Sequence, residues 1–366
     1  MCMDGSDYNM NVNASPIILG IGTALPERVI TNEELSARFK NDKFNSFLDV
    51  AGIRERRVIA PSQSAGDLAE LAANALLDAV ALDRNEIDAI IYRTQTPEYR
   101  IPSTACILQS RLGLSQRAMT FDMVQGCGSF IPEFATSASL LGSGIARNIL
   151  AIHSDAFSQI INPMDQELVP IHGDGAVAIL YKQGSVLTGS TIDWFEFGVD
   201  GKHAEHIIVP EGMSRSPLRP ESLVEETFEN GSIRAPSQLK MNGAAVFHFV
   251  VHTIPQFIKN ACATHGTSLE EYDLVLFHQA NKMMVSMLYG MLKIPKEKQF
   301  YFLEKVGNMS GVTLPFMLSE ALKADRIREG SRVLLCGFGA GLSWGAVSLT
   351  WQSSPCVLPE TAILRG

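Results

Sequence analysis

Apolar and polar positions alternate in two distinct rhythms along the first part of the chain. Short apolar runs bounded by glycine or proline predict buried strands, whereas apolar residues that recur every three or four positions predict amphipathic helices. The expected elements are strands over residues 15–26, 88–94 and 118–124, and helices that begin at Thr31 or cover residues 65–82 and 102–111. Because strands and helices alternate, the pattern predicts an α/β fold with a mainly parallel, covered sheet.

The rest of the chain repeats this organisation. Strands are expected over residues 148–154, 173–181, 271–277, 331–341 and 342–351, and helices over residues 128–144, 282–292 and up to residue 322. The tripeptide Gly-Ala-Val occurs at Gly175 and again at Gly345, at the end of two similar units, which indicates an internal duplication. We therefore expect two halves, residues 1–185 and 186–366. Residues 198–236 are rich in Pro, Gly, Glu and Arg and predict a surface excursion or cap.

Composition narrows the class of protein. The 366 residues include 46% hydrophobic and 19% charged residues, as in ordinary globular proteins, and the net charge of −9 argues against nucleic-acid or anionic membrane partners. The six cysteines are scattered without metal-ligand spacing, which favours a reducing environment and predicts no metal site. The first dozen residues do not resemble a signal peptide, and no apolar stretch approaches the length of a spanning helix. We expect a cytoplasmic protein.

Cys127 lies where the strand expected over residues 118–124 turns into a helix, and a glycine stands on either side of it. The unpaired N–H groups at a helix N-terminus favour a thiolate over a thiol, so this position predicts an activated nucleophile. A lone cysteine can equally be an inert buried residue, and both interpretations remain open on this evidence alone.

Two further polar residues follow apolar segments in the second half. His278 comes directly after the strand expected over residues 271–277, and strand ends of such sheets are where reactive groups collect. Asn308 lies in a glycine-flanked turn before a helix. Taken singly, a histidine is more often structural, and an asparagine in a turn is most often a cap.

Two other motifs could in principle bind phosphate or a nucleotide. The cations at Arg54, Arg56 and Arg57 belong either to a solvated loop or to a phosphate-binding site. The glycine-rich run 337–341 precedes a strand rather than a helix, so it does not predict a dinucleotide site.

Four motifs together resemble one family. Cys127, His278-Gln-Ala-Asn281, Gly307-Asn308 and the segment 337–345 are similar to the β-ketoacyl-acyl-carrier-protein synthase III family of the thiolase superfamily, in the same order and with similar spacing. The resemblance implies a five-layered α/β/α/β/α fold of two duplicated halves, a homodimer, and a reaction that needs no cofactor.

The resemblance also implies an activity. Cys127 would accept an acyl group, and neutral His278 together with Asn308 would donate hydrogen bonds to a malonyl thioester as it loses CO2. The resulting carbanion would attack the acyl-Cys127 in a decarboxylative Claisen condensation, with the backbone N–H groups of Cys127 and Ala340 as the oxyanion hole. The substrates would be acyl-coenzyme A or an acylated carrier protein, together with a malonyl thioester carried on acyl carrier protein, in fatty-acid or specialised lipid or polyketide biosynthesis. The substrate-binding residues implied are Ile101, Gly243, Asn281 and Phe338.

The chain departs from the family pattern where coenzyme A binds. Ser46 and Gln166 stand in place of the tryptophan and arginine that sandwich the adenine, and Val50 replaces another arginine. Loss of this stacking should cost nucleotide binding about 1–2 kcal/mol, so we expect a donor carried on a protein. Ile101 replaces a phenylalanine that limits acyl length, which predicts a longer or branched acyl group.

An acidic carrier protein would need a basic docking face. Met283 stands where the family has an arginine, and the candidate docking residues are Lys282, Lys293, Lys296 and Lys298. Two alternative functions remain open from the sequence. One is an acyltransferase that forms an ester or amide without decarboxylation, and the other is a silent subunit of a heterodimer.

Overall fold

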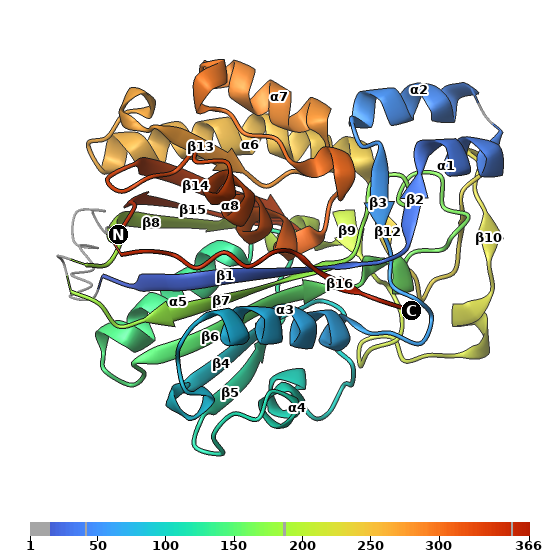
Figure 1. Ribbon diagram of the computed structural model, residues 1–366. Coiled ribbons are helices and arrows are strands. Elements are labelled where there is room, and N and C mark those ends of the chain that lie inside the picture. Colours follow the sequence, from blue (N-terminus) through green and yellow to red (C-terminus); the bar gives the residue numbers. More distant parts are fainter. Residues whose placement is uncertain (1–14, 41, 186–187, 353) are drawn as a thin grey trace, which may run out of the picture.

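The computed structural model describes residues 15–40, 42–185, 188–352 and 354–366. They form two mixed sheets with helices between and outside them (Figure 1). The larger sheet has the strand order β16 (Ala362–Leu364), β1 (Ile17–Pro26), β7 (Gly175–Lys182), β6 (Asn148–Asp155), β4 (Ala89–Arg93) and β5 (Met119–Met123). The smaller sheet has the order β13 (Leu274–Phe277), β14 (Arg332–Gly339), β15 (Ser343–Thr350) and β8 (Thr191–Val199).

The two sheets repeat one pairing pattern. In the larger sheet β1 pairs antiparallel with β7, β7 antiparallel with β6, and β6 parallel with β4. In the smaller sheet β8, β15, β14 and β13 pair in the same sequence of directions. The repeat agrees with an internal duplication, although the chain end returns to the first sheet because β16 pairs with β1. The division at residue 185 stays a prediction.

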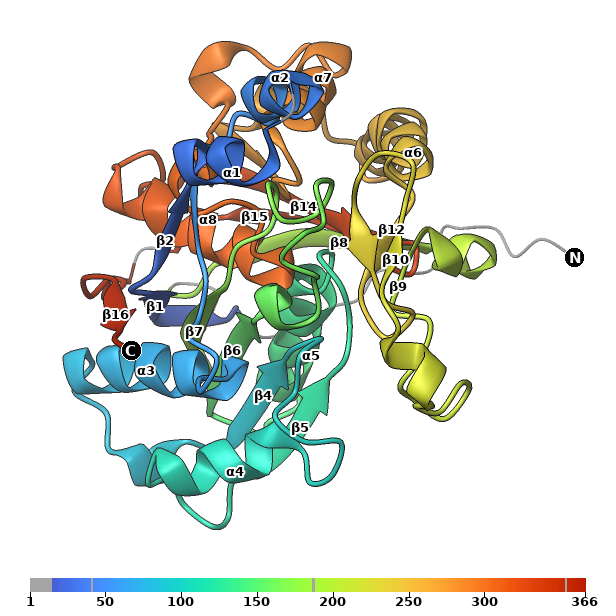
Figure 2. The same ribbon diagram turned by 90° about the vertical axis from the view of Figure 1, so that its right-hand side faces the viewer.

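Helices complete a five-layered α/β/α/β/α arrangement (Figures 1 and 2). The outer face of the larger sheet is covered by α3 (Ala65–Ala79) and α4 (Thr104–Arg111), and that of the smaller sheet by α6 (Gly243–Thr264) and α7 (Lys282–Met291). Between the sheets lie α5 (Phe130–Gly142) and α8 (Thr313–Lys323). Separate apolar cores fill the spaces between these layers. The expected α/β fold class is therefore confirmed, whereas the expectation of a mainly parallel sheet is wrong, because β7 and β15 each pair antiparallel with both of their neighbours.

Smaller elements complete the fold. Helices α1 (Asn32–Phe39) and α2 (Asp42–Ala51) stand near α7 with the hairpin of β2 (Val29–Thr31) and β3 (Glu55–Arg57) (Figure 2). The predicted excursion is largely exposed and carries the short strands β9 (Ile207–Ile208), β10 (Glu226–Thr227) and β11 (Ile233–Arg234), and β12 (Lys240–Met241) follows it. Short 3-10 helices occupy Arg84–Glu86, Phe157–Gln159, Gly201–His206, Pro220–Leu223, Leu269–Glu271, Lys296–Lys298, Leu303–Lys305 and Ser310–Val312.

The arginine cluster is not a single feature. Arg56 is fully buried and donates hydrogen bonds to the carbonyl oxygens of Ile30, at 3.2 Å, and Pro170, at 2.7 Å. Neither of the roles considered from the sequence fits Arg56, because it ties β2 to the segment before His172. Exposed Arg54 pairs with Glu304 at 2.9 Å. Within the described ranges, no helix is long and apolar enough to cross a bilayer.

Candidate active site

The ends of strands from both sheets meet at one small cavity of about 50 Å³. The turn after β5 brings Cys127 to it, the end of β13 brings His278, and the end of β14 brings Phe338 and Ala340. Asn308 reaches the same cavity from the turn before α8. Residues far apart in the sequence, and from both halves, are thus gathered at one place.

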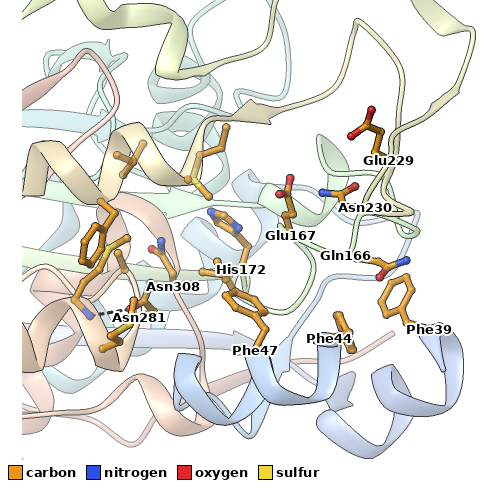
Figure 3. A pocket seen from close by; sticks show the side chains of 18 of the residues that line it. Phe39, Phe44, Phe47, Gln166, Glu167, His172, Glu229, Asn230, Asn281 and Asn308 are labelled. Carbon is orange, nitrogen blue, oxygen red and sulfur yellow. Dashed lines mark hydrogen bonds between the residues drawn. The ribbon is translucent and has the colours of Figure 1, made fainter. Parts of the chain in front are cut away.

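A wider cavity of about 1030 Å³ adjoins this small one. Residues that line both are His172, Met241, Val246, Ala280 and Asn308. In Figure 3, Asn308 and His172 lie well inside the wide cavity, whereas Phe39, Gln166, Glu229 and Asn230 lie at its outer end. The wide cavity is therefore an entrance that leads to the small cavity at Cys127.

Cys127 is held tightly against the end of β14. A Cβ added to Gly339 would lie 2.7 Å from Cys127 Cβ and 3.1 Å from Sγ, so only glycine allows this approach. Burial raises the pKa of the Cys127 thiol, while a hydrogen bond with Ser310 at 3.7 Å and the charge of Arg93 act in the opposite direction. The expected preference for thiolate is therefore wrong for the free protein. Cys127 lies two residues before Ser129, the N-cap of α5, and desolvation dominates.

His278 is 1% exposed, and its ring meets the ring of Phe338 edge-on with centroids 5.5 Å apart. Burial lowers the pKa of His278 to about 3, and the positive charge of Arg93 acts in the same direction. The imidazole is therefore neutral at pH 7. Its Nδ1 is sealed from solvent and has no hydrogen-bond partner among the described residues. A substrate could reach this ring only through Nε2.

Asn308 is oriented by its own turn. Its side-chain Oδ1 accepts hydrogen bonds from the Ser310 N–H at 2.9 Å and from Thr313 Oγ1 at 3.4 Å. Its backbone pairs with the segment around His172, with the Asn308 N–H donating to Ile171 O at 2.8 Å. Because the amide oxygen is occupied, the Nδ2 group is left as the donor available to the cavity.

His172 was not identified from the sequence. It lines both cavities, and its Nδ1 lies 3.0 Å from the carbonyl oxygen of Leu168. A carbonyl only accepts, so Nδ1 carries the proton and Nε2 is an acceptor. Burial lowers the pKa of His172, which keeps it neutral at pH 7. The sequence held no signal for it beyond its place before the Gly173-Asp-Gly turn.

A buried polar network behind Cys127 was also missed. Arg93 is fully buried, forms an ion pair with Asp155, and donates from Nε to Gln125 O at 2.8 Å. Its Nη2 lies 3.3 Å from Ser310 Oγ. The sequence did contain a signal, because an arginine inside an apolar strand must find partners in the core.

The other residues implied by the resemblance are more scattered. Asn281 and Gly243 line the wide cavity, and Asn281 Oδ1 caps α7 by accepting from the Met284 N–H at 2.9 Å. Ile101 is 84% exposed and is not among the residues that line either cavity. Lys282 begins α7, whereas Lys293, Lys296 and Lys298 follow the end of that helix.

Comparisons with known proteins agree on one family. Residues 121–201 match the profile described as 3-oxoacyl-[acyl-carrier-protein] synthase III, and residues 262–351 match the profile of its C-terminal part. A β-ketoacyl-[acyl-carrier-protein] synthase III from Rhodopirellula baltica is 35% identical over 350 residues, which cover 91% of this chain and 98% of the relative. The chain belongs to the β-ketoacyl-acyl-carrier-protein synthase III family.

Solved structures of this family share the fold. A crystal structure of a 3-oxoacyl-(acyl-carrier-protein) synthase III superposes with a TM-score of 0.87 at 33% identity, over 92% of this chain and all of that one. The synthase III from Thermus thermophilus gives a TM-score of 0.79 at 32% identity, with 92% and 100% coverage. A priming β-ketosynthase of the R1128 polyketide pathway, at 23% identity and a TM-score of 0.79, shares the fold. As a ketoacyl synthase III, the chain is an acyltransferase of thiolase-like fold.

Proposed function

We propose that this synthase III transfers an acyl group from a thioester to Cys127 and condenses it with a malonyl thioester, releasing CO2 and a 3-oxoacyl thioester. One observation carries the proposal: the side chain of Cys127 shares a small cavity with the side chains of His278 and Asn308. A thiolate suits acyl exchange with a thioester because the product remains an activated thioester.

The two donors suit decarboxylation. Negative charge develops on the thioester oxygen of the malonyl group as CO2 leaves, and fixed N–H groups stabilise that charge. The neutral ring of His278 and the free amide N–H of Asn308 are such donors, whereas a protonated histidine is not required. In this scheme protein N–H groups stabilise the negative charge on the thioester oxygen, so neither a metal nor an organic cofactor is needed.

The entrance supports a donor carried on a protein rather than on coenzyme A. Among the described residues lining the wide cavity, the charged side chains are one lysine and three carboxylates, namely Lys40, Asp42, Glu167 and Glu229. The Ser46 hydroxyl donates to the Asp42 carbonyl oxygen at 3.1 Å, and Gln166 lies at the mouth (Figure 3). Such a lining gives coenzyme A phosphates little attraction. The pantetheine part of a carrier-bound phosphopantetheine arm is uncharged and has no such need, and the one phosphate of the arm stays at the carrier protein.

Docking of an acyl carrier protein would then involve the face beside the entrance. Lys282 is exposed at the start of α7, and its neighbour Met283 lines the wide cavity. Lys298 donates to Glu270 O at 2.7 Å, and Lys293 and Lys296 follow the other end of the helix. We therefore assign Lys282 the principal electrostatic contact among the four lysines.

The acyl group and the assembly state form part of the same proposal. The cavity at Cys127 holds about 50 Å³, which is room for a few water-sized atoms. Accommodation of a longer or branched acyl group would require Ile101 to act on the cavity of a second copy, as in a homodimer. A cytoplasmic location is proposed with it.

The test is a product assay with acylated and malonylated carrier protein. Stoichiometric CO2 and a 3-oxoacyl thioester support the proposal, whereas an ester or amide formed without CO2 would favour the non-decarboxylating alternative. Replacing the acyl carrier with acyl-coenzyme A tests the donor. Efficient saturable priming at low micromolar acyl-coenzyme A would contradict the carrier-bound assignment.

A further inference from the structure

The buried polar network behind Cys127 leads directly to its sulfur. Ser310 Oγ lies 3.7 Å from Cys127 Sγ, 3.3 Å from Arg93 Nη2 and 3.3 Å from Gln95 Oε1. Ser310 and Arg93 are both 0% exposed. A single hydroxyl therefore connects a buried guanidinium with the nucleophile.

The Ser310 hydroxyl can donate its hydrogen bond to either of two acceptors. A guanidinium only donates, so Arg93 engages a lone pair of Ser310 Oγ. In the thiol form, the Cys127 S–H donates to the second lone pair, and the hydroxyl proton points to Gln95 Oε1. A thiolate has no proton to donate and is a strong acceptor, so the hydroxyl can rotate and donate to Sγ.

We propose that Ser310 is a positioning residue whose hydroxyl turns from Gln95 to the Cys127 sulfur when the thiolate forms, conveying the polarisation of Arg93 to the nucleophile. This inference rests on the proposed role of Cys127 as the acyl acceptor. The thiol proton leaves to water, and the Ser310 proton stays on its oxygen throughout. The thiolate then forms a C–S bond to the acyl carbon while the donor C–S bond breaks and the donor departs as a thiolate. The resulting thioester sulfur is a poor acceptor, so the hydroxyl returns to Gln95.

The local backbone is shaped for this contact. Ser310 has a φ of 54°, in the left-handed region that side-chain-bearing residues seldom adopt. A Cβ on the next residue, Gly311, would lie 2.3 Å from Arg93 Cζ, so glycine leaves the space that the guanidinium fills. The Ser310 N–H also orients Asn308 through its 2.9 Å hydrogen bond. One residue thus serves both the nucleophile and an amide donor.

The charges around the Cys127 sulfur leave a buried thiolate in need of a hydrogen-bond donor. Burial raises the pKa of Cys127, and Asp155 acts in the same direction, whereas Ser310 and Arg93 lower it. His278 and His172, whose pKa values are lowered by burial, are neutral at pH 7 and supply no positive charge there. The hydrogen bond from Ser310 is then the direct means by which the buried thiolate is stabilised.

The experiment measures the pH dependence of Cys127 alkylation by iodoacetamide in the full chain, read as peptide mass. No acyl donor is needed, so the result is separate from success or failure of the condensation assay. Ser310→Ala should raise the pKa of Cys127 by about one pH unit and slow alkylation about tenfold at pH 7, as expected for loss of a hydrogen bond to a charged group. Ser310→Gly, which suits the left-handed backbone, should give the same change.

The matched control is Ser129→Ala, because Ser129 Oγ is buried nearby without a hydrogen-bond partner among the described residues. Exposed Cys106 provides an internal reference, and buried Cys336 should stay unmodified while the fold is intact. A purely structural role for Ser310 would change the limiting rate at high pH but not the midpoint. An unchanged midpoint in both Ser310 variants would overturn the proposal.

Discussion

The sharpest consequence of the site geometry concerns the side-chain amide of Asn308. Replacing it by Asp changes one atom in kind and almost nothing in shape. One carboxylate oxygen can keep the hydrogen bonds that Asn308 Oδ1 accepts in the wild type from the Ser310 N–H, at 2.9 Å, and from Thr313 Oγ1, at 3.4 Å. The other oxygen would face the cavity as an acceptor, where the wild-type protein presents an N–H donor.

The size of the effect follows from the function proposed for that donor. Removing one fixed donor to a developing oxyanion typically slows the step about 100-fold to 1000-fold, or about 2.7–4 kcal/mol. Asn308 is 5% exposed, so water cannot readily replace the lost hydrogen bond. Asn308→Asp should therefore slow malonyl decarboxylation by at least about 100-fold, while acylation of Cys127 falls much less, because acylation does not use this donor and is affected only through the added negative charge.

Two assays separate these steps. Intact-protein mass measures acylation, and CO2 release from malonyl carrier protein measures decarboxylation. Asn230→Asp is the matched control, because Asn230 Oδ1 also accepts the N–H two residues on, from Ser232 at 2.9 Å, but lies at the outer mouth (Figure 3). If decarboxylation in Asn308→Asp stayed within about threefold of wild type, or if acylation fell equally, the assigned role would be refuted.

Three further outcomes follow from the structure. Burial lowers the pKa of His278 to about 3, so the unfolded chain protonates this histidine at a higher pH than the folded chain does. The free energy of unfolding therefore falls as the pH drops from about 6.5 toward 3. His278→Gln should remove about 2 kcal/mol of this loss of stability at pH 5, measured by urea unfolding. Lys282→Glu should raise the KM for carrier-bound substrate roughly fivefold, whereas Lys293→Glu, beyond the far end of α7, should change it little; equal effects would contradict the docking assignment. Gly311→Ala would place a Cβ 2.3 Å from Arg93 Cζ and should lower the free energy of unfolding by about 1–3 kcal/mol or more; an unchanged thermal midpoint would show that the guanidinium can move.

The fold was largely predictable because its signals are local. The strand that ends before Cys127 and the helix that follows it were expected from apolar spacing, and they appear as β5 and α5. The gathering of Cys127, His278 and Asn308 could be predicted only from the family resemblance, since no local rule brings residues of different halves together. The structure places all three at one cavity.

What could not be predicted depends on packing between distant segments. The thiol of Cys127 was expected to favour its charged form, but burial by parts of both halves decides its pKa. The place of Arg93 inside an apolar strand signals its burial, but the partners of Arg56 and of Arg93 come from residues remote in the sequence, so the partners could not be identified locally. Ile101 is exposed on the single chain, and its predicted effect on acyl length awaits a second copy.

The central claim is that Cys127 carries the acyl group that is then condensed. Its most direct test is intact-protein mass spectrometry of the wild type and Cys127→Ala after exposure to a panel of acyl thioesters, followed by malonyl carrier protein. The account predicts a mass increase of one acyl group that requires Cys127 and disappears, with release of CO2, when the malonyl thioester is added. No Cys127-dependent adduct from any donor, on coenzyme A or on carrier protein, would contradict it.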